Sequence, residues 1–117
     1  MTQARLYHNP RCSKSRGALE LLEARGVSVE VVRYLETPPR EDELRALLAA
    51  LGIPARQLLR TGEQEYQALG LADPSLDENA LIAAMAAHPR LIERPILVKD
   101  GRAVIGRPPE KVLELLG

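Results

Sequence analysis

The stretch RLYHNPRCSKSRGALELLEARGVSVEVVRY, residues 5–34, sets the order of elements at the start of the chain. Residues 5–8 end at the turn pair Asn9-Pro10, which predicts a first strand. At 27–31 valine alternates with serine and glutamate, which predicts a second strand through about Tyr34. The residues between the two strands are expected to form a helix. Strand, helix and strand together are long enough for a right-handed parallel crossover.

The expected first helix has sequence signals at both ends. Ser13 or Ser15 can cap its start, because a serine hydroxyl accepts a hydrogen bond from a free backbone N–H group. Gly26 follows Arg25 at the place where helices usually stop. The turn before this helix therefore lies between a strand end and a helix start. The apolar face of the helix consists of Ala18, Leu19 and Leu22.

The middle of the chain is predicted to be helical. Residues 41–51 follow two prolines and carry leucines on a single helical face. Short helical turns are expected at 55–59 and 63–69. Ser75-Leu76-Asp77-Glu78 matches a capping box, with Ser75 as the cap, and opens a further helix that His88-Pro89 stops.

The last third returns to strands. Residues 96–98 and 103–105 flank Asp100-Gly101, which is a strong sequence signal for a hairpin. A final helix is expected after Pro108. Its inward-facing residues are expected to be Val112, Leu113 and Leu116.

This order of elements predicts an α/β fold. A β-α-β unit, a helical block and a β-β-α unit fit a mixed four-stranded sheet with helices on its faces, the thioredoxin-like arrangement. The helical block is then an insertion at about 38–90. At 117 residues, the chain is expected to be a single domain.

Composition excludes several functions. The chain has 16 Lys and Arg residues and 16 Asp and Glu residues, a balance that argues against a nucleic-acid or membrane binder. Aromatic residues make up 3%, too few for a base-stacking platform. The longest apolar run, 80–87, is far too short to cross a bilayer, and the start lacks the apolar stretch of a signal peptide. We therefore expect a cytoplasmic protein.

The single cysteine, Cys12, is the main candidate for chemistry. One cysteine can form neither an intrachain disulfide nor a zinc cluster of several thiolates, so no metal is expected. Arg11, Lys14 and Arg16 surround it, and the helix start directs backbone N–H groups toward it. Both effects stabilise a thiolate and attract a tetrahedral oxyanion. The alternative is a small buried apolar residue, which the polar neighbours make the weaker interpretation.

The run His8-Asn9-Pro10-Arg11-Cys12-Ser13-Lys14-Ser15-Arg16 resembles the active-site segment of the glutaredoxin-coupled arsenate reductase family. The resemblance covers almost the whole chain in order, and it implies the same thioredoxin-like fold with a helical insertion. The chain ends soon after the last expected helix, as in a short-chain branch of that family. The further matching segments are 34–39, 58–60, 91–96 and 106–108.

The resemblance implies a role for several residues. Cys12 matches the nucleophile that attacks arsenate and forms a covalent thiol–arsenate intermediate. Arg60, Arg94 and Arg107 match the arginines that bind the oxyanion. Guanidinium groups suit this role because they form bidentate hydrogen bonds to oxyanions and do not deprotonate.

The environment of the thiolate and the electron supply follow from the same resemblance. His8 and Ser15, together with Arg16, are expected to support the thiolate, and Pro95 matches a cis-proline that faces the active site. The resemblance implies glutathione as co-substrate and glutaredoxin as the partner that reduces the mixed disulfide, with no bound cofactor. This scheme agrees with a chain that has no second thiol of its own.

Two other functions remain open on the sequence. One is a non-enzymatic regulator of the same fold that senses redox state or binds RNA polymerase. Such regulators typically use a Cys-x-x-Cys switch, and position 15 here is serine, which weighs against a disulfide switch. The other is a glutathione-dependent thiol oxidoreductase that acts on another anion or mixed disulfide.

Overall fold

A computed structural model describes residues 4–116 and divides the chain into two compact units. The first, which we call the sheet unit, extends through Thr37 and resumes at Arg94. The second, the helical unit, is Pro38–Glu93. Among residues 4–116, no helix combines the length and apolar character needed to span a membrane.

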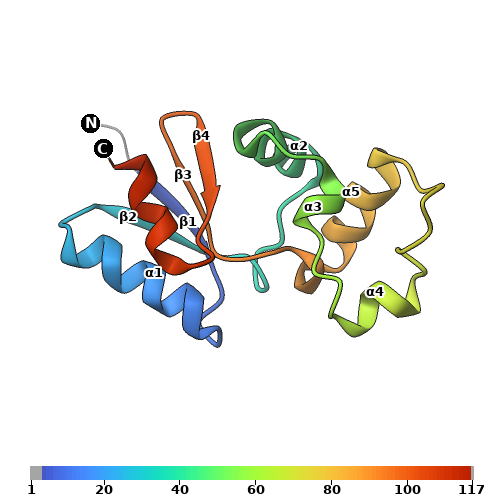
Figure 1. Ribbon diagram of the computed structural model, residues 1–117, viewed down its shortest axis with the longest axis horizontal. Helices are drawn as coiled ribbons and strands as arrows, with labels where there is room; N and C mark the ends of the chain where they lie inside the picture. The colour runs from blue at the N-terminus through green and yellow to red at the C-terminus, as the bar shows by residue number, and fades with distance from the viewer. Residues whose placement is uncertain (1–3, 117) are drawn as a thin grey trace. The chain divides into compact units, whose positions relative to one another are not determined.

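The sheet unit contains a four-stranded mixed sheet with the strand order β2-β1-β3-β4 (Figure 1). The central strand β1 pairs in parallel with β2 and antiparallel with β3, which in turn pairs antiparallel with β4. The predicted α/β class, the parallel crossover and the thioredoxin-like sheet are confirmed. The bounds are β1 Ala4–His8, α1 Ser13–Ala24, β2 Val29–Arg33, β3 Ile96–Lys99, β4 Arg102–Ile105 and η2, a 3₁₀ helix, Pro109–Leu115.

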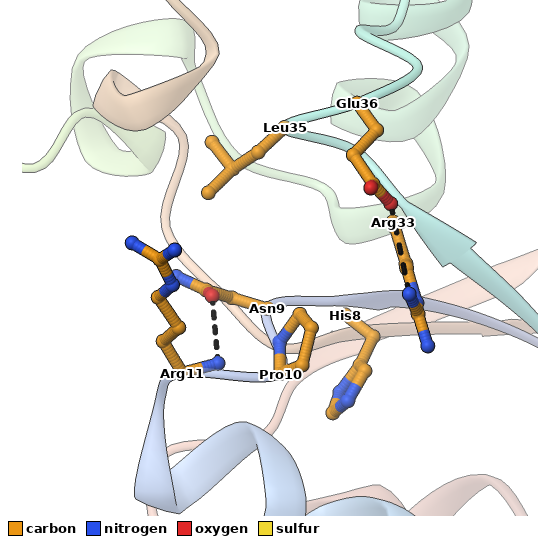
Figure 2. A pocket seen from close by; sticks show the side chains of 7 residues that line it. All are labelled: His8, Asn9, Pro10, Arg11, Arg33, Leu35 and Glu36. Carbon is orange, nitrogen blue, oxygen red and sulfur yellow. Dashed lines mark hydrogen bonds and ion pairs between the residues drawn. The ribbon is translucent and has the colours of Figure 1, made fainter.

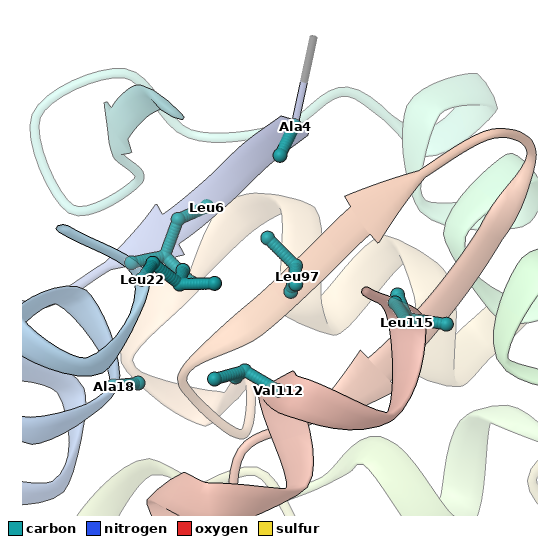
Figure 3. Packing of buried hydrophobic residues seen from close by; sticks show 7 residues of the cluster. All are labelled: Ala4, Leu6, Ala18, Leu22, Leu97, Val112 and Leu115. Atoms are coloured by element: carbon teal, nitrogen blue, oxygen red, sulfur yellow. The ribbon is translucent and has the colours of Figure 1, made fainter. Parts of the chain in front are cut away.

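The core of the sheet unit is formed by the face of the sheet that α1 and η2 cover (Figure 3). Leu6 and Leu97 lie opposite each other in the β1–β3 register and are completely buried. Burying a leucine stabilises a fold by roughly 1.5–3 kcal/mol, so this shared face holds α1 and η2 against the strands. The other buried members of the cluster are Ala4, Ala18, Leu22, Val112 and Leu115.

The N-terminus of α1 differs from the predicted one, whereas its C-terminus agrees with the prediction. The N-cap is Cys12, with no side-chain cap hydrogen bond, so the predicted caps Ser13 and Ser15 are wrong. Gly26 adopts a φ of 70° beyond the last turn. The Val27 N–H donates to the Leu22 carbonyl at 3.1 Å, and this bond closes the helix end. Because the Val27 N–H is bonded to the helix, β2 begins at Val29, two residues after the first valine of the alternating pattern.

The hairpin turn is as predicted, whereas the last helix differs from the prediction in its type and in the residues that it buries. Asp100 and Gly101 have φ values of 55° and 74°, which gives the predicted tight turn between β3 and β4. The final helix is a 3₁₀ helix, and its two buried residues, Val112 and Leu115, are three positions apart, the repeat of that helix type. Leu113 and Leu116, expected to face inward, are only partly buried against the core.

The regular elements of the helical unit are all helices (Figure 1). α2 packs against α5, and α3 also contacts α5. The leucine stripe of α2 is buried at three positions, and Gly52 ends the helix with a φ of 70°. The bounds are α2 Glu41–Leu51, α3 Ala55–Leu58, α4 Gln64–Ala68, α5 Glu78–Ala87 and the 3₁₀ helix η1 Pro89–Leu91.

The cap of α5 is not the predicted one. Asp77 is the N-cap, and its carboxylate accepts the Ala80 N–H at 2.8 Å. Ser75 instead forms hydrogen bonds from its N–H and its hydroxyl to the Asp73 carboxylate. The predicted capping box is therefore wrong by two residues, because a carboxylate closer to the helix start serves as the acceptor.

One glycine allows the close approach of three segments of the sheet unit. A Cβ on Gly106 would lie 2.9 Å from Pro95 Cγ and 2.9 Å from Val112 Cγ1. Both atoms belong to completely buried side chains, so neither can move freely. Gly106 therefore lets the end of β4 lie directly against the residue before β3 and against η2.

We predict that Gly106→Ala lowers the free energy of unfolding by about 1–3 kcal/mol, because an added methyl group overpacks this contact. Gly17→Ala is the matched control, since its Cβ would meet Pro109 Cγ at an ordinary 3.5 Å. Urea denaturation of the two variants measures the difference. Equal stability of the two variants would contradict the packing role of Gly106.

Candidate active site

Several chain segments meet at the end of the sheet where the central strand β1 finishes. We call this end the sheet edge. β1 ends at His8, and its register pairs Tyr7 with Ile96, which places His8 level with Pro95. The β3–β4 register continues in the same way, and the Gly106 N–H donates to the Pro95 carbonyl at 2.8 Å. The turn that carries Cys12, the residues before β3 and the residues after β4 therefore meet at this edge.

Cys12 is half-buried between the turn and α1. Its N–H donates to the Asn9 carbonyl at 3.0 Å, and its carbonyl accepts the Arg16 N–H at 2.9 Å. These two bonds fix the backbone of the nucleophile candidate on both sides. As the N-cap, Cys12 stands before the first N–H groups of α1, which have no acceptor within the helix. No acidic residue lies in the first turn of α1 to compete for them.

Behind the turn, His8 and Ser15 form a buried polar contact. Ser15 Oγ lies 2.7 Å from His8 Nδ1 and accepts the Asn9 N–H at 3.0 Å. Because Oγ accepts that N–H, its own proton is available to Nδ1. Ser15 is completely buried and His8 almost so. The contact ties the end of β1 to the first turn of α1, across the segment that carries Cys12.

The electrostatic environment keeps His8 neutral. Burial lowers the pKa of His8 below its ordinary value, and the positive charges of Arg33 and Arg16 lower it further. A neutral ring can accept the hydroxyl proton of Ser15 at Nδ1, whereas a charged ring has no acceptor. Burial, with the two arginines, thus favours the form of the ring that holds the His8–Ser15 contact.

Arg16 lies over the turn rather than apart from it. Its Nη1 donates to the Pro10 carbonyl at 2.9 Å, and the residue is exposed to solvent. The Arg11 N–H donates to the Asn9 side chain at 3.0 Å. The side chain of Arg16 thus contacts the backbone of the turn that carries Cys12, and the turn itself is held by the Asn9 side chain.

A pocket of about 460 Å³ opens beside this turn (Figure 2). Arg11 rises on one side, and Arg33 with Glu36 forms the other side, where the two side chains lie 3.9 Å apart. Sequence reasoning missed Arg33 and Glu36. The parallel pairing of His8 with Arg33 is the signal that places the end of β2 here. The lining residues are His8, Asn9, Pro10, Arg11, Arg33, Leu35 and Glu36.

Arg94 and Arg107 lie next to each other at the same edge of the sheet. Arg107 Nη1 donates to the Arg94 carbonyl at 3.2 Å. Nε and Nη1 of the Arg94 guanidinium are buried. The Arg94–Pro95 peptide bond is cis, and so is the Arg107–Pro108 bond. The two arginines flank the β3–β4 hairpin: Pro95 lies between Arg94 and β3, and Gly106 lies between β4 and Arg107.

Arg60 belongs to the helical unit and has its own partners there. Its N–H donates to the Leu91 carbonyl at 2.8 Å, beside the bridge between Leu59 and Ile92. Its Nη1 forms an ion pair with Glu63, and its Nε lies 3.6 Å from Glu93. Sequence reasoning did not anticipate these two carboxylates.

Within residues 4–116, no three His, Cys, Asp or Glu side chains gather closely enough to hold a metal ion. The chemical resources of the sheet edge are a half-buried thiol, backbone N–H groups of a helix start and guanidinium groups. Such a set suits a nucleophilic sulfur that reacts with an oxyanion.

The fold and this edge define a thioredoxin-like protein with one cysteine at the start of its first helix. The model of the ArsC family matches residues 7–115. The chain belongs to the ArsC family.

Relatives cover nearly the full length of the chain. It is 58% identical to the uncharacterized protein YfgD of Escherichia coli K12 over 116 residues, 98% of each chain. It is 49% identical to an arsenate reductase of Neisseria meningitidis over 117 residues, 99% of this chain and 100% of that protein. A solved structure of an arsenate reductase from Vibrio cholerae is 51% identical, with a TM-score of 0.94 over 97% of each chain.

The lowered pKa of His8 predicts a pH dependence of stability. In the unfolded chain histidine titrates near 6.5, whereas folded His8 titrates below that value. The unfolded state therefore binds the proton first as the pH falls. The stabilisation is fully present above pH 6.5 and is lost as the pH falls through 6.5 toward the folded pKa. Urea denaturation at several pH values, for wild type and His8→Gln, should show that the variant loses this component.

A titration of the His8 ring by NMR measures the same quantity directly. We expect a midpoint below 6.5. A midpoint at or above this value would show that burial and the neighbouring arginines do not act on the ring as described.

Proposed function

We propose that this protein is an arsenate reductase with Cys12 as its nucleophile. The observation that carries the proposal is the position of Cys12 as N-cap of α1, at the sheet edge where Arg94 and Arg107 also lie. The 49% identity to a protein named arsenate reductase supports arsenate as the oxyanion. We further propose the cytoplasm as its compartment, where a lone thiol stays reduced.

The residues take distinct roles in this proposal. Arg60, Arg94 and Arg107 are the oxyanion-binding arginines, since arsenate is an anion whose approach to a thiolate requires neutralising charge. His8 and Ser15 position the turn through their buried contact, and this supports the thiolate. Arg16 adds positive charge over the same turn. Pro95 lies at this edge in the cis form, as the cis-proline expected to face the active site.

In the first half of the proposed cycle, Cys12 and glutathione together supply the two electrons that reduce arsenic. The Cys12 sulfur bonds to arsenic, and one oxygen of arsenate leaves as water after two protonations. The sulfur of glutathione then bonds to the Cys12 sulfur, and the electron pair of the sulfur–arsenic bond passes to arsenic. Arsenic is reduced from As(V) to As(III) and leaves as arsenite. Two sulfur atoms are oxidised to the mixed disulfide.

The second half of the cycle restores the thiol. Glutaredoxin, with a further glutathione, reduces the mixed disulfide on Cys12 by thiol–disulfide exchange. An external thiol is required because Cys12 is the single cysteine of the chain. The protein itself binds no cofactor in this scheme, and glutathione is a co-substrate.

We predict that Cys12→Ser abolishes arsenate-dependent turnover, because a serine hydroxyl at neutral pH does not replace a thiolate as nucleophile. The assay contains arsenate, glutathione, glutaredoxin and a system that regenerates the reductant. Circular dichroism of the variant verifies that the fold is intact. Substantial turnover by the variant would contradict the mechanism. Turnover by the wild-type protein in the absence of glutathione would also contradict it.

We also predict that Arg107→Lys lowers kcat/KM for arsenate by about ten- to a hundredfold, since a lysine keeps the charge and loses charge-assisted hydrogen bonds worth roughly 1.5–3 kcal/mol each. Arg40→Lys is the control, because Arg40 is exposed and its partner Asp42 lies 3.6 Å away at the surface. Wild-type kcat/KM in Arg107→Lys would exclude Arg107 from the oxyanion site.

A further inference from the structure

Arg60 is not surrounded by positive charge alone, as would be expected of an arginine that binds an anion. Two carboxylates face its guanidinium: Glu63 at Nη1 and Glu93 at Nε, the latter at 3.6 Å. Arg90 Nη2 also lies 3.9 Å from the second oxygen of Glu63. Two cations and two carboxylates thus form one cluster with no net formal charge.

The cluster is partly shielded from water. The side chains of Arg60 and Glu93 are each 25% exposed and that of Glu63 is 17% exposed, whereas Arg90 is 66% exposed. Ion pairs that are partly removed from water are screened less than those on the open surface. Glu63 therefore acts mainly on Arg60 and only weakly on Arg90.

The backbone holds these groups together. The Arg60 N–H donates to the Leu91 carbonyl, and the Glu93 N–H donates to the Leu58 carbonyl at 2.9 Å. The two segments are thereby paired across the bridge of Leu59 with Ile92. Glu63 follows Arg60 across a short turn, and its N–H donates to the Arg60 carbonyl at 3.4 Å. The carboxylates are thus fixed beside the guanidinium by the fold of the helical unit.

We propose that Glu63 and Glu93 set the anion affinity of Arg60 and so determine the specificity of the oxyanion site. This inference rests on the proposed function, in which Arg60 binds the oxyanion. An incoming anion competes with the two carboxylates for the same N–H groups and is repelled by their charges. An anion with a single charge and few acceptor oxygens competes poorly, whereas a tetrahedral dianion competes better.

The test is the affinity of the full chain for sulfate, a stable tetrahedral dianion, measured by isothermal titration calorimetry. Glu63→Gln keeps the shape of the side chain and removes its charge. We expect it to tighten sulfate binding by roughly two- to fivefold, the range given by the coupling of a partly exposed ion pair. Glu41→Gln is the matched control, since it removes the same charge from a pair with Arg45 at 3.8 Å elsewhere in the helical unit.

A double-mutant cycle separates the possible outcomes. Arg60→Gln should weaken sulfate binding, and in that background Glu63→Gln should have little further effect, because the group it competes for is gone. Weakened binding in Arg60→Gln together with unchanged or weaker binding in Glu63→Gln would overturn the role of the carboxylates and leave the proposed function intact. Unchanged binding in Arg60→Gln would remove Arg60 from the oxyanion site, and the inference would fail with it.

A purely structural role of the cluster is distinguished in the same experiment. In that case Glu63→Gln would lower the melting temperature without changing the sulfate affinity. If Glu63→Gln does not fold, Glu93→Gln provides the same comparison, because its carboxylate faces Nε of the same guanidinium. A tighter sulfate complex in either folded variant, absent from Glu41→Gln, supports the proposal.

Discussion

The site depends on the pairing of β1 on both of its sides. The strand is parallel to β2 and antiparallel to β3, so its last residue, His8, lies level with Arg33 on one side and with Pro95 on the other. Cys12 follows one turn later, and the β3–β4 register adds Gly106 to the same edge. A slip of one residue in either pairing would reverse the face of each β1 side chain and move the turn away from the arginines.

Charge at this edge is arranged by burial as much as by residue type. Burial lowers the pKa of His8, and the positive charges of nearby arginines lower it further. The neutral ring can then form the hydrogen bond with the Ser15 hydroxyl. The turn therefore gathers cations without adding a charged histidine to them. In the helical unit the balance is different, because carboxylates face Arg60 directly.

Features with local signals could be predicted from the sequence, and features that depend on distant residues could not. The hairpin at Asp100-Gly101 follows from residues that tolerate a positive φ, and the family-like run identified the candidate nucleophile. Ser15 was expected to cap α1 because serine favours that position, yet its buried hydroxyl binds His8, seven residues earlier. Glu63 is three positions from Arg60, whereas Glu93 is 33 positions away and reaches Arg60 through the pairing of Leu59 with Ile92.

The proposed mechanism requires that Cys12 becomes covalently linked to glutathione as arsenate is reduced. Intact-mass spectrometry of the protein, incubated with arsenate and glutathione in the absence of glutaredoxin, tests it most directly. We predict one glutathione adduct, located at Cys12 by peptide mapping, that forms with arsenate and is absent without it. No adduct in the presence of arsenate, or equal adduct formation without arsenate, would contradict the account.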